Sequence, residues 1–471
     1  MSLPSRKHAI VIGGSMAGLC AVRVLADHFE QVTLVERDAF TDTPAPRKGV
    51  PQGRQLHALL KRGEDVLEQL FPDLIPGLLA AGAVSMEMGT DFRWYHQGGW
   101  KVNAPSGVVS VSSTRPLLEQ HVRRRVLALP NVRCLDGHEI TGLVTTAGSR
   151  LVTGVKIRAK DTEDASVATL DATLVVDASG RGSAAPRWLE SLGCATPTES
   201  IVKVNVGYAS RVYQRPPAGT VPWKACYVIG PAPDNKRIGA IFSIEGGRWI
   251  AVLAGTLGEH PPSDEAGFMA FARGLPDPVI ADALALATPL DDIALYRFPA
   301  HQRRHYELLG DLPDGFIAVG DAHCSFNPIY GQGMTCAALG ALDLRACLEA
   351  YRGRDMLVGF SQRFQRALAV TVDGAWLMST TEDFRYPAVE GPRPFYSNAL
   401  KWYTSRVHAA VHYDVEVARA FYRAMHMLAP PTSLMHPAIL VRVLFGRGKG
   451  SAGPVFSPVV EVGVAAAGGR R

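Results

Sequence analysis

Apolar residues gather along the chain in short runs that alternate with helix-like stretches. His8–Ile12 and Gln31–Glu36 are rich in apolar and β-branched residues and predict two buried strands, and residues 16–28 between them predict a helix. Leu174–Asp177 and Phe316–Gly320 repeat the buried-strand pattern farther along the chain. Buried strands that are joined through helices favour a mostly parallel sheet covered by helices, so the predicted fold class is α/β.

Other stretches predict helices and sheets around this unit. Apolar spacing predicts a helix from about Arg54 to Leu70, and a second helix over Arg115–Leu127 with Ser113 as its cap. A long apolar helix is predicted over Met334–Tyr351, and residues 357–445 are mainly helical and rich in aromatic side chains. Sheet patterns fill the segments 83–113, 132–158 and 195–310.

These elements predict domains that are discontinuous in sequence. A chain of 471 residues exceeds what one hydrophobic core usually supports. The predicted division is a first domain of residues 1–80, 114–192 and 311–356, a mixed-sheet domain of residues 81–113 and 193–310, and a C-terminal helical region of residues 357–471.

Charge and cysteine usage exclude several classes of protein. The 49 basic and 44 acidic residues give a net charge of +5 without a separate basic block, so no nucleic-acid partner is expected. The cysteines number seven and form no Cys-x-x-Cys pair, which favours free thiols in a reducing compartment over a disulfide framework or a zinc site. No metal site is predicted. Glycines interrupt the apolar run Ala9–Leu25, and no other segment has the roughly 18 uninterrupted apolar residues of a membrane span. A cytoplasmic protein without a transmembrane segment is therefore expected.

The turn between the first strand and the first helix carries a glycine fingerprint. Gly13, Ser15 and Gly18 match Gly-x-Gly-x-x-Gly with serine in the second position. Gly13 would make the tight turn, Ser15 would let the backbone approach a diphosphate, and Gly18 would let the helix pack closely on the strand. The helix start would offer free N–H groups to phosphates, and Glu36 would accept both ribose hydroxyls of FAD or NAD. The residues predicted to bind the cofactor here are Gly13, Gly14, Ser15, Met16, Ala17, Gly18, Glu36 and Arg37.

A second motif selects FAD from these two cofactors. Asp321 follows a strand end and would accept a hydrogen bond from a ribityl hydroxyl. Pro328–Met334 opens a helix with glycines, whose N–H groups would suit the edge of an isoalloxazine ring that becomes negative on reduction. The cofactor-binding residues predicted here are Asp321, Gly331, Gln332, Gly333 and Met334.

A third stretch, Asp177–Arg187, is an acidic strand end followed by a glycine turn and a helix. With these three motifs the chain resembles the group A FAD-dependent monooxygenases, the p-hydroxybenzoate hydroxylase-like family, over nearly its full length. The resemblance implies a Rossmann-like FAD-binding domain of the glutathione-reductase type, interleaved with a mixed β-sheet substrate domain. The third motif departs from the family pattern because Ala178 stands where the family has glycine.

The resemblance also implies a chemistry and further site residues. In this family a reduced flavin reacts with O₂ to give a C4a-hydroperoxide, which hydroxylates or epoxidises a hydrophobic small molecule. Arg47 and Arg115 resemble residues that contact the flavin, and Asp177 is included as a cofactor-binding residue. Pro328, near the reactive edge of the flavin, and His57 are the predicted catalytic residues. NADPH or NADH would be the reductant, unless a separate flavin reductase supplies the reduced flavin.

Two stretches are similar to bacterial polyether epoxidases and related natural-product oxygenases: Gly49–His57 and Glu382–Pro387. The substrate pocket is expected between the flavin and the sheet over residues 195–300, with the C-terminal helices as a lid. Its candidate aromatic residues are Trp223, Tyr227, Phe242 and Trp249.

Three alternatives stay open. A flavin-dependent halogenase would be similar, but the Trp-x-Trp-x-Ile-Pro stretch of that family is absent. A prenyl-chain reductase would use reduced FAD without oxygen. The third alternative is a non-catalytic flavoprotein.

Overall fold

The structure is a computed structural model that describes residues 6–146, 150–160, 166–353 and 357–446. Parts of the predicted domains therefore lie outside the described residues, namely residues 1–5, 147–149, 161–165, 354–356 and 447–471.

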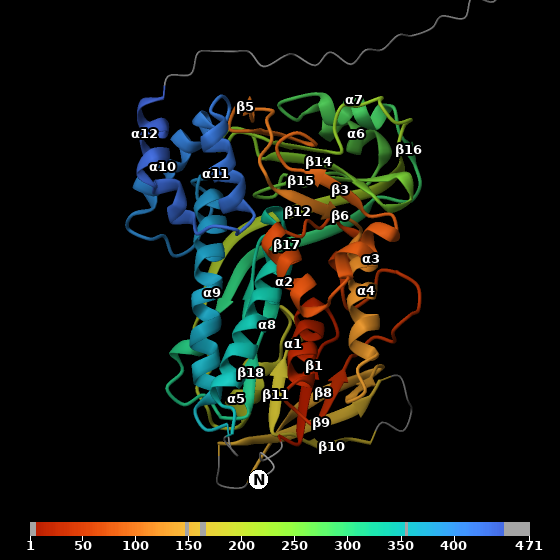
Figure 1. Cartoon of the computed structure of the whole chain (residues 1–471), viewed down its shortest axis with the longest axis vertical. Helices are drawn as coiled ribbons and strands as arrows, with labels where there is room; N and C mark the ends of the chain where they lie inside the picture. The colour runs from red at the N-terminus through yellow and green to blue at the C-terminus, as the bar shows by residue number, and fades with distance from the viewer. Residues whose placement is uncertain (1–5, 147–149, 161–165, 354–356, 447–471) are drawn as a thin grey trace, which may run out of the picture.

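A five-stranded parallel sheet forms the centre of the lower half of the molecule in Figure 1. The strands lie in the order β18-β11-β1-β2-β7, and every neighbouring pair is parallel. Their bounds are β1 His8–Ile12, β2 Gln31–Val35, β7 Val132–Leu135, β11 Leu174–Asp177 and β18 Phe316–Ala318.

Successive side chains of a strand point to opposite faces of a sheet, and the two faces of this sheet are covered by different elements. Ala9 and Val11 of β1 pack into a core that is shared with helices, whereas Ile10 and Ile12 pack against an antiparallel sheet of three strands. The helices are α1 Met16–Ala26, α2 Lys61–Leu70, α4 Arg115–Leu127, α8 Gly333–Ala350 and α9 Phe360–Asp383. The three strands are β8 His138–Thr145, β9 Val152–Ala159 and β10 Ala168–Asp171.

A larger mixed sheet of nine strands forms the upper half. Its path is β19-β17-β12-β15-β14-β13-β4-β5, with β16 paired to β12. The strands are β4 Phe92–His96, β5 Gly99–Trp100, β12 Glu199–Gln214, β13 Ala225–Ile229, β14 Arg237–Ile244, β15 Arg248–Gly255, β16 Thr288–Pro289, β17 Ala294–Arg304 and β19 Cys324–Ser325.

Successive side chains in this sheet also point to opposite faces. Phe242 and Ile250 face the C-terminal helices, whereas Ile241 and Trp249 face α6 and α7. On one face lie α6 Glu265–Arg273 and α7 Val279–Ala285. The C-terminal helices on the other face are α10 Ser397–Ala410, α11 Val415–Met425 and α12 Pro437–Phe445. Figure 1 shows α10, α11 and α12 grouped beside the larger sheet, at the upper end of α9. The smaller elements are α3 Leu74–Ala80, α5 Ala185–Ser191 and the pair β3 Val84–Glu87 and β6 Val109–Ser112.

The α/β fold class and most predicted elements are confirmed, and two local predictions are wrong. The helix predicted from Arg54 begins only at Lys61, because residues 55–60 run without helical hydrogen bonds along the cavity described below. Thr114, not Ser113, caps α4, since its side chain accepts a hydrogen bond from the Leu117 N–H. The segment 195–310 is rich in strands, as predicted, and it also contains α6 and α7.

The seven cysteines all lie within the described residues and are free, and six of them are buried. Among the described residues, no helix combines the length and the apolar character that crossing a bilayer requires.

Candidate flavin site

The turn between β1 and α1 has two positions at which only glycine fits. Gly13 has a φ of +102°, and a Cβ there would lie 2.5 Å from the carbonyl oxygen of Ala178. A Cβ on Gly18 would lie 1.8 Å from the carbonyl oxygen of Gly13, so the first turn of α1 lies directly against the strand end. The tight turn and the close helix–strand contact predicted from the fingerprint are therefore confirmed.

The carboxylate of Glu36 is bound to this turn. The Gly14 N–H donates to Glu36 Oε2 at 2.7 Å, and the Asp38 N–H donates to Oε1 at 3.0 Å. Arg47 Nη1 lies 3.2 Å from the same Oε2. A carboxylate accepts about four hydrogen bonds, so Glu36 keeps acceptor capacity for hydroxyl groups. Arg37, by contrast, is exposed and donates to the Gly49 carbonyl oxygen at 3.3 Å.

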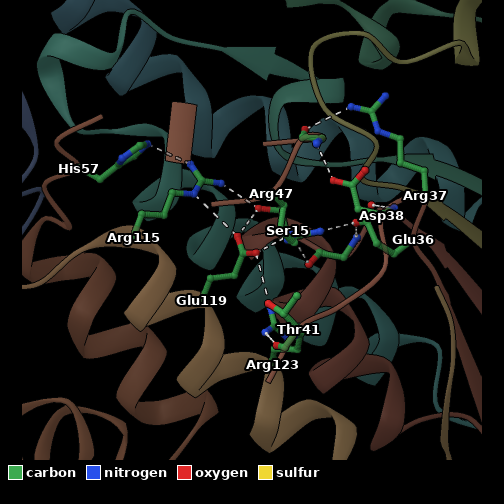
Figure 2. A network of polar contacts seen from close by, with 12 residues as sticks. Ser15, Glu36, Arg37, Asp38, Thr41, Arg47, His57, Arg115, Glu119 and Arg123 are labelled. Carbon is green, nitrogen blue, oxygen red and sulfur yellow. Dashed lines mark hydrogen bonds and ion pairs between the residues drawn. The ribbon is translucent and has the colours of Figure 1, made fainter. Parts of the chain in front are cut away.

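Two arginines and a glutamate meet over the start of α1 (Figure 2). Arg47 donates to Glu119 Oε1 at 2.5 Å and to the Gly14 carbonyl oxygen at 3.2 Å. Ser15 Oγ donates to Glu119 Oε2 at 2.7 Å and accepts from Arg115 Nη2 at 2.8 Å. Burial lowers the pKa of Arg47, but Glu119 and Glu36 outweigh it, so the pKa lies above its ordinary value.

Glu119 is the residue of this network that the sequence did not predict. It is buried, and it lies one helical turn from both Arg115 and Arg123, at 3.8 Å and 4.0 Å from their guanidinium nitrogens. An acidic residue with arginines at i−4 and i+4 is a signal that the sequence contains. That signal points to an ion pair on a helix and not to a cofactor site.

His57 orients Arg115. Its Nδ1 donates to the Gln55 carbonyl oxygen at 2.8 Å, because a carbonyl can only accept, and its Nε2 therefore accepts from Arg115 Nη1 at 3.1 Å. Burial, followed by the charge of Arg115, lowers the pKa of His57 to about 3. Both ring nitrogens of the neutral imidazole therefore form hydrogen bonds, an arrangement that suits a residue holding the Arg115 side chain in place. The predicted catalytic role of His57 stays a prediction.

The second motif lies against the first. Gly320 has a φ of +58°, and a Cβ there would lie 2.5 Å from Ala17 Cβ on α1. This contact brings Asp321 to the start of α1, near Arg115. Burial raises the pKa of Asp321, and the charges of Arg115 and Arg181 oppose that rise.

Open space lies beside the backbone of Gly333, at the start of α8. Gly331 has a φ of +65°, and a Cβ there would lie 3.1 Å from the Ala58 carbonyl oxygen, whereas a Cβ on Gly333 would meet nothing within 4 Å. Gln332 is 2% exposed, and its Oε1 has no hydrogen-bond partner among the described residues. Met334 is buried in the first turn of the helix. Glycine backbone beside open space suits the approach of a ligand.

A buried polar network holds the loop before α8. Asp383, the last residue of α9, accepts from Tyr330 OH at 2.8 Å and lies 2.5 Å from His301 Nε2. Asn327 Nδ2 lies 3.3 Å from each carboxylate oxygen of Asp383, and Asn327 Oδ1 accepts from Tyr208 OH at 2.8 Å. The network connects α9, β12, β17 and the loop.

A cavity of about 270 Å³ lies between this loop and the larger sheet. Pro328–Gln332 and Gln55–Leu60 line it, together with aromatic residues of the sheet and residues of the C-terminal helices. The other lining residues include Met86, Phe92, Trp94, Tyr208, Tyr227, Phe242, Tyr296, Met378, Tyr403, Val407, Phe421 and Met425. The lining is mostly apolar and aromatic, as small-molecule sites usually are.

Two of the four predicted pocket aromatics do not line the cavity. Tyr227 and Phe242 line it, but Trp223 and Trp249 stack on each other with centroids 5.3 Å apart, in the core on the other face of the sheet. Strand alternation places Trp249 there, and Trp223, just before β13, stacks on it.

Asp177 has a structural role in the third motif, where it stabilises the turn after β11. Its fully buried carboxylate accepts from the Ser179 N–H at 3.0 Å and from the hydroxyls of Ser179 and Ser183. These contacts hold the turn after β11. A cofactor contact of Asp177 stays a prediction.

Solved structures show which class of fold this is. The p-nitrophenol 4-monooxygenase PnpA from Pseudomonas putida has a TM-score of 0.63 and 16% sequence identity, over 91% of this chain and 99% of that chain. A flavoprotein/dehydrogenase from Cytophaga hutchinsonii has a TM-score of 0.64 and 15% identity, over 89% and 92%. The flavin-dependent brominase Bmp2 has a TM-score of 0.63 and 12% identity, over 89% and 93%. The chain therefore has the fold shared by flavin-dependent monooxygenases and halogenases, which confirms the predicted fold class.

The sequence comparison identifies the family. Protein Rv3254 of Mycobacterium tuberculosis (strain ATCC 25618 / H37Rv) is 34% identical over 433 residues, which cover 90% of each protein. The chain belongs to the family of Protein Rv3254. No protein-family model matches it.

Proposed function

We propose that the chain is an FAD-dependent monooxygenase that hydroxylates or epoxidises an apolar small molecule. The observation that carries the proposal is the position of the apolar cavity against the Pro328–Gln332 loop, which opens α8. The same α8 motif lies against the glycine turn of α1 through Gly320 and Ala17. A ligand that is extended between the two helix starts would therefore reach the cavity with one end.

The residues at both helix starts fit FAD. Glu36 has free acceptor capacity for ribose hydroxyls, and Gly13–Gly18 brings backbone N–H groups to the start of α1, beside Arg47 and Arg115. At the other end, the open space beside Gly333 and the unpartnered Oε1 of Gln332 suit the polar edge of a flavin ring.

The further cofactor contacts are assigned by motif. Asp321 would hold the ribityl chain, and Gly331–Met334 would hold the pyrimidine side of the ring. The bound flavin, once reduced, would supply the activation of O₂. NADPH or NADH would be the reductant, either directly or through a separate reductase.

The chain's own residues shape the reaction space. Pro328 lines the cavity next to the proposed ring site, and the aromatic walls would exclude water once a substrate is bound. Both stretches that resemble polyether epoxidases contribute to the cavity, through Gln52 and His57 in one and Glu382 and Tyr386 in the other. This supports an apolar substrate of the kind that natural-product oxygenases transform.

The proposal includes the division into domains and a cytoplasmic location. The FAD-binding domain would comprise residues 1–80, 114–192 and 311–356, and the substrate domain residues 81–113 and 193–310. The C-terminal helices would close the cavity, since residues of α9, α10 and α11 line it.

A flavin-dependent halogenase is the second candidate, because the fold is shared with the brominase Bmp2. One experiment separates the candidates: NADPH oxidation by the purified protein, with and without O₂, with and without halide, and with apolar alkenes or phenols. We expect oxygen uptake that the apolar compound stimulates and that halide does not affect. Halide-dependent turnover would favour the halogenase, and anaerobic turnover would favour a reductase.

A further inference from the structure

A group of titratable side chains lines the part of the cavity that the C-terminal helices form. His96, at the end of β4, and His408, on α10, have ring centroids 4.4 Å apart. Glu382 of α9 lies beside them, with Oε1 3.5 Å from His408 Nε2. We call these three residues, together with Trp94 and Lys101, the polar cluster. None of its members belongs to the proposed flavin site.

Lys101 lies directly behind the cavity wall. Its Nζ is 4.4 Å from the centroid of Trp94 and 4.2 Å from that of Phe421, and both rings line the cavity. Lys101 is 4% exposed, and its Nζ has no hydrogen-bond partner among the described residues. A buried ammonium group is normally paired with an acceptor. Ring contacts stabilise this one only in part.

The polar cluster has more donors than acceptors. Trp94 Nε1, a donor, and one ring nitrogen each of His96 and His408 also lack a partner among the described residues. The carboxylate of the cluster is already engaged, because Arg385 Nε lies 2.8 Å from Glu382 Oε2 and Arg385 Nη2 lies 3.2 Å from Oε1. The indole and ammonium N–H groups are therefore left without an acceptor.

The charge balance decides which ligand suits the polar cluster. The ligand atoms of His96, Glu382 and His408 lie within 4.8 Å of one another, a spacing that a metal ion could also use. Glu382 and Arg385 offset each other's charge, so Lys101 leaves the cluster with an excess positive charge, which a divalent cation would increase and an anion would offset. An anion would also give the unpartnered donors their missing acceptor.

We propose that the polar cluster binds the carboxylate of an elongated apolar substrate, whose chain extends through the cavity toward Pro328–Gln332. The direction of the chain rests on the proposed function, because it places the oxidised carbon next to the flavin site. Binding of the acid group itself depends only on the cluster.

Calorimetry with two ligands of equal chain length tests this. We expect decanoate to bind the purified protein at least about tenfold more tightly than decan-1-ol, since a charge-assisted contact contributes about that much to affinity. Lys101→Met keeps the side-chain stem between the two rings and should abolish the preference for the acid. Lys101→Arg should preserve it, and so should Lys203→Met, which changes an exposed lysine.

Equal affinity of the wild-type protein for both ligands would overturn the proposal, and so would a preference that survives Lys101→Met. Stoichiometric binding of Zn²⁺ that is lost in His96→Asn would assign the cluster to a metal and would also overturn it. The measurement needs no turnover, so it is separate from the proposed function. A protein that prefers the acid but takes up no FAD would contradict only the flavin proposal.

Discussion

Tyr330 donates a 2.8 Å hydrogen bond to Asp383, and this bond joins the loop that opens α8 to the end of α9. The two residues lie 53 positions apart in the chain. His301 and Asn327 share the same carboxylate. One buried carboxylate of the C-terminal region therefore holds the loop that borders both the cavity and the proposed flavin ring.

Asp383→Asn should loosen this loop. An amide group cannot accept from all three neighbours, and its NH₂ would face a donor. We expect the free energy of unfolding to fall by about 1.5–3 kcal/mol, the contribution of hydrogen bonds to a charged group. Chemical denaturation measures it. Asp373→Asn on the same helix is the control, because that side chain is 60% exposed and its ion pair should contribute only about 0–1 kcal/mol. Equal effects of the two variants would contradict the role given to Asp383.

Gly18→Ala tests the contact between α1 and the strand end. A Cβ would lie 1.8 Å from the Gly13 carbonyl oxygen, so α1 must move away. We expect a loss of about 3 kcal/mol or more in stability, at the upper end of overpacking effects, together with loss of bound flavin. Gly182→Ala is the matched control, since its Cβ would meet nothing within 4 Å. A stable Gly18→Ala protein with normal flavin content would rule out this geometry.

Local patterns account for what the sequence predicted well. The apolar run of β1 and the glycine spacing at Gly13 and Gly18 depend only on residues that are close together in the sequence. The segment 55–60 was mispredicted because distant residues hold it: Gln55 Nε2 donates to the Ala294 carbonyl oxygen at 3.0 Å, and Gln55 Oε1 accepts from Ser210. These contacts outweigh the helical spacing of its leucines.

The part of the site that the sequence did not predict is formed by residues far apart in the chain. Asp383 meets His301 across 82 positions, and Glu119 meets Arg47 across 72 positions. Each of these residues alone looks like an ordinary polar residue on a helix, a strand or a loop. Only the packing of the helices on the two sheets brings them together.

Glu119→Gln should destabilise the protein. Glu119 is buried and accepts from both Arg47 and Ser15, so the amide would leave the Arg47 charge without one of its two partners. We expect the free energy of unfolding to fall by about 1.5–3 kcal/mol. Glu416→Gln, in an exposed pair with Arg419, should change it by less than about 1 kcal/mol. If both substitutions were neutral in denaturant titrations, Glu119 would have no structural role.

His57 should make stability depend on pH. Burial and Arg115 lower its pKa to about 3 in the folded protein, so the unfolded chain binds up to one more proton than the folded chain between about pH 3 and 6.5. Stability therefore falls as the pH falls from 6.5, by about 1.4 kcal/mol per pH unit for this proton. His57→Asn should remove that contribution, and unfolding free energies between about pH 4.5 and 6.5 should fall less steeply than in the wild type. Parallel curves would disagree with the neutral, buried imidazole.

Binding of FAD by the purified protein tests the central claim most directly. We expect one FAD per chain, with a flavin absorbance spectrum, and about 10- to 100-fold weaker binding in Asp321→Ala, which removes one charge-assisted contact. A protein that is colourless as purified, and that stays colourless after incubation with excess FAD, would contradict the account.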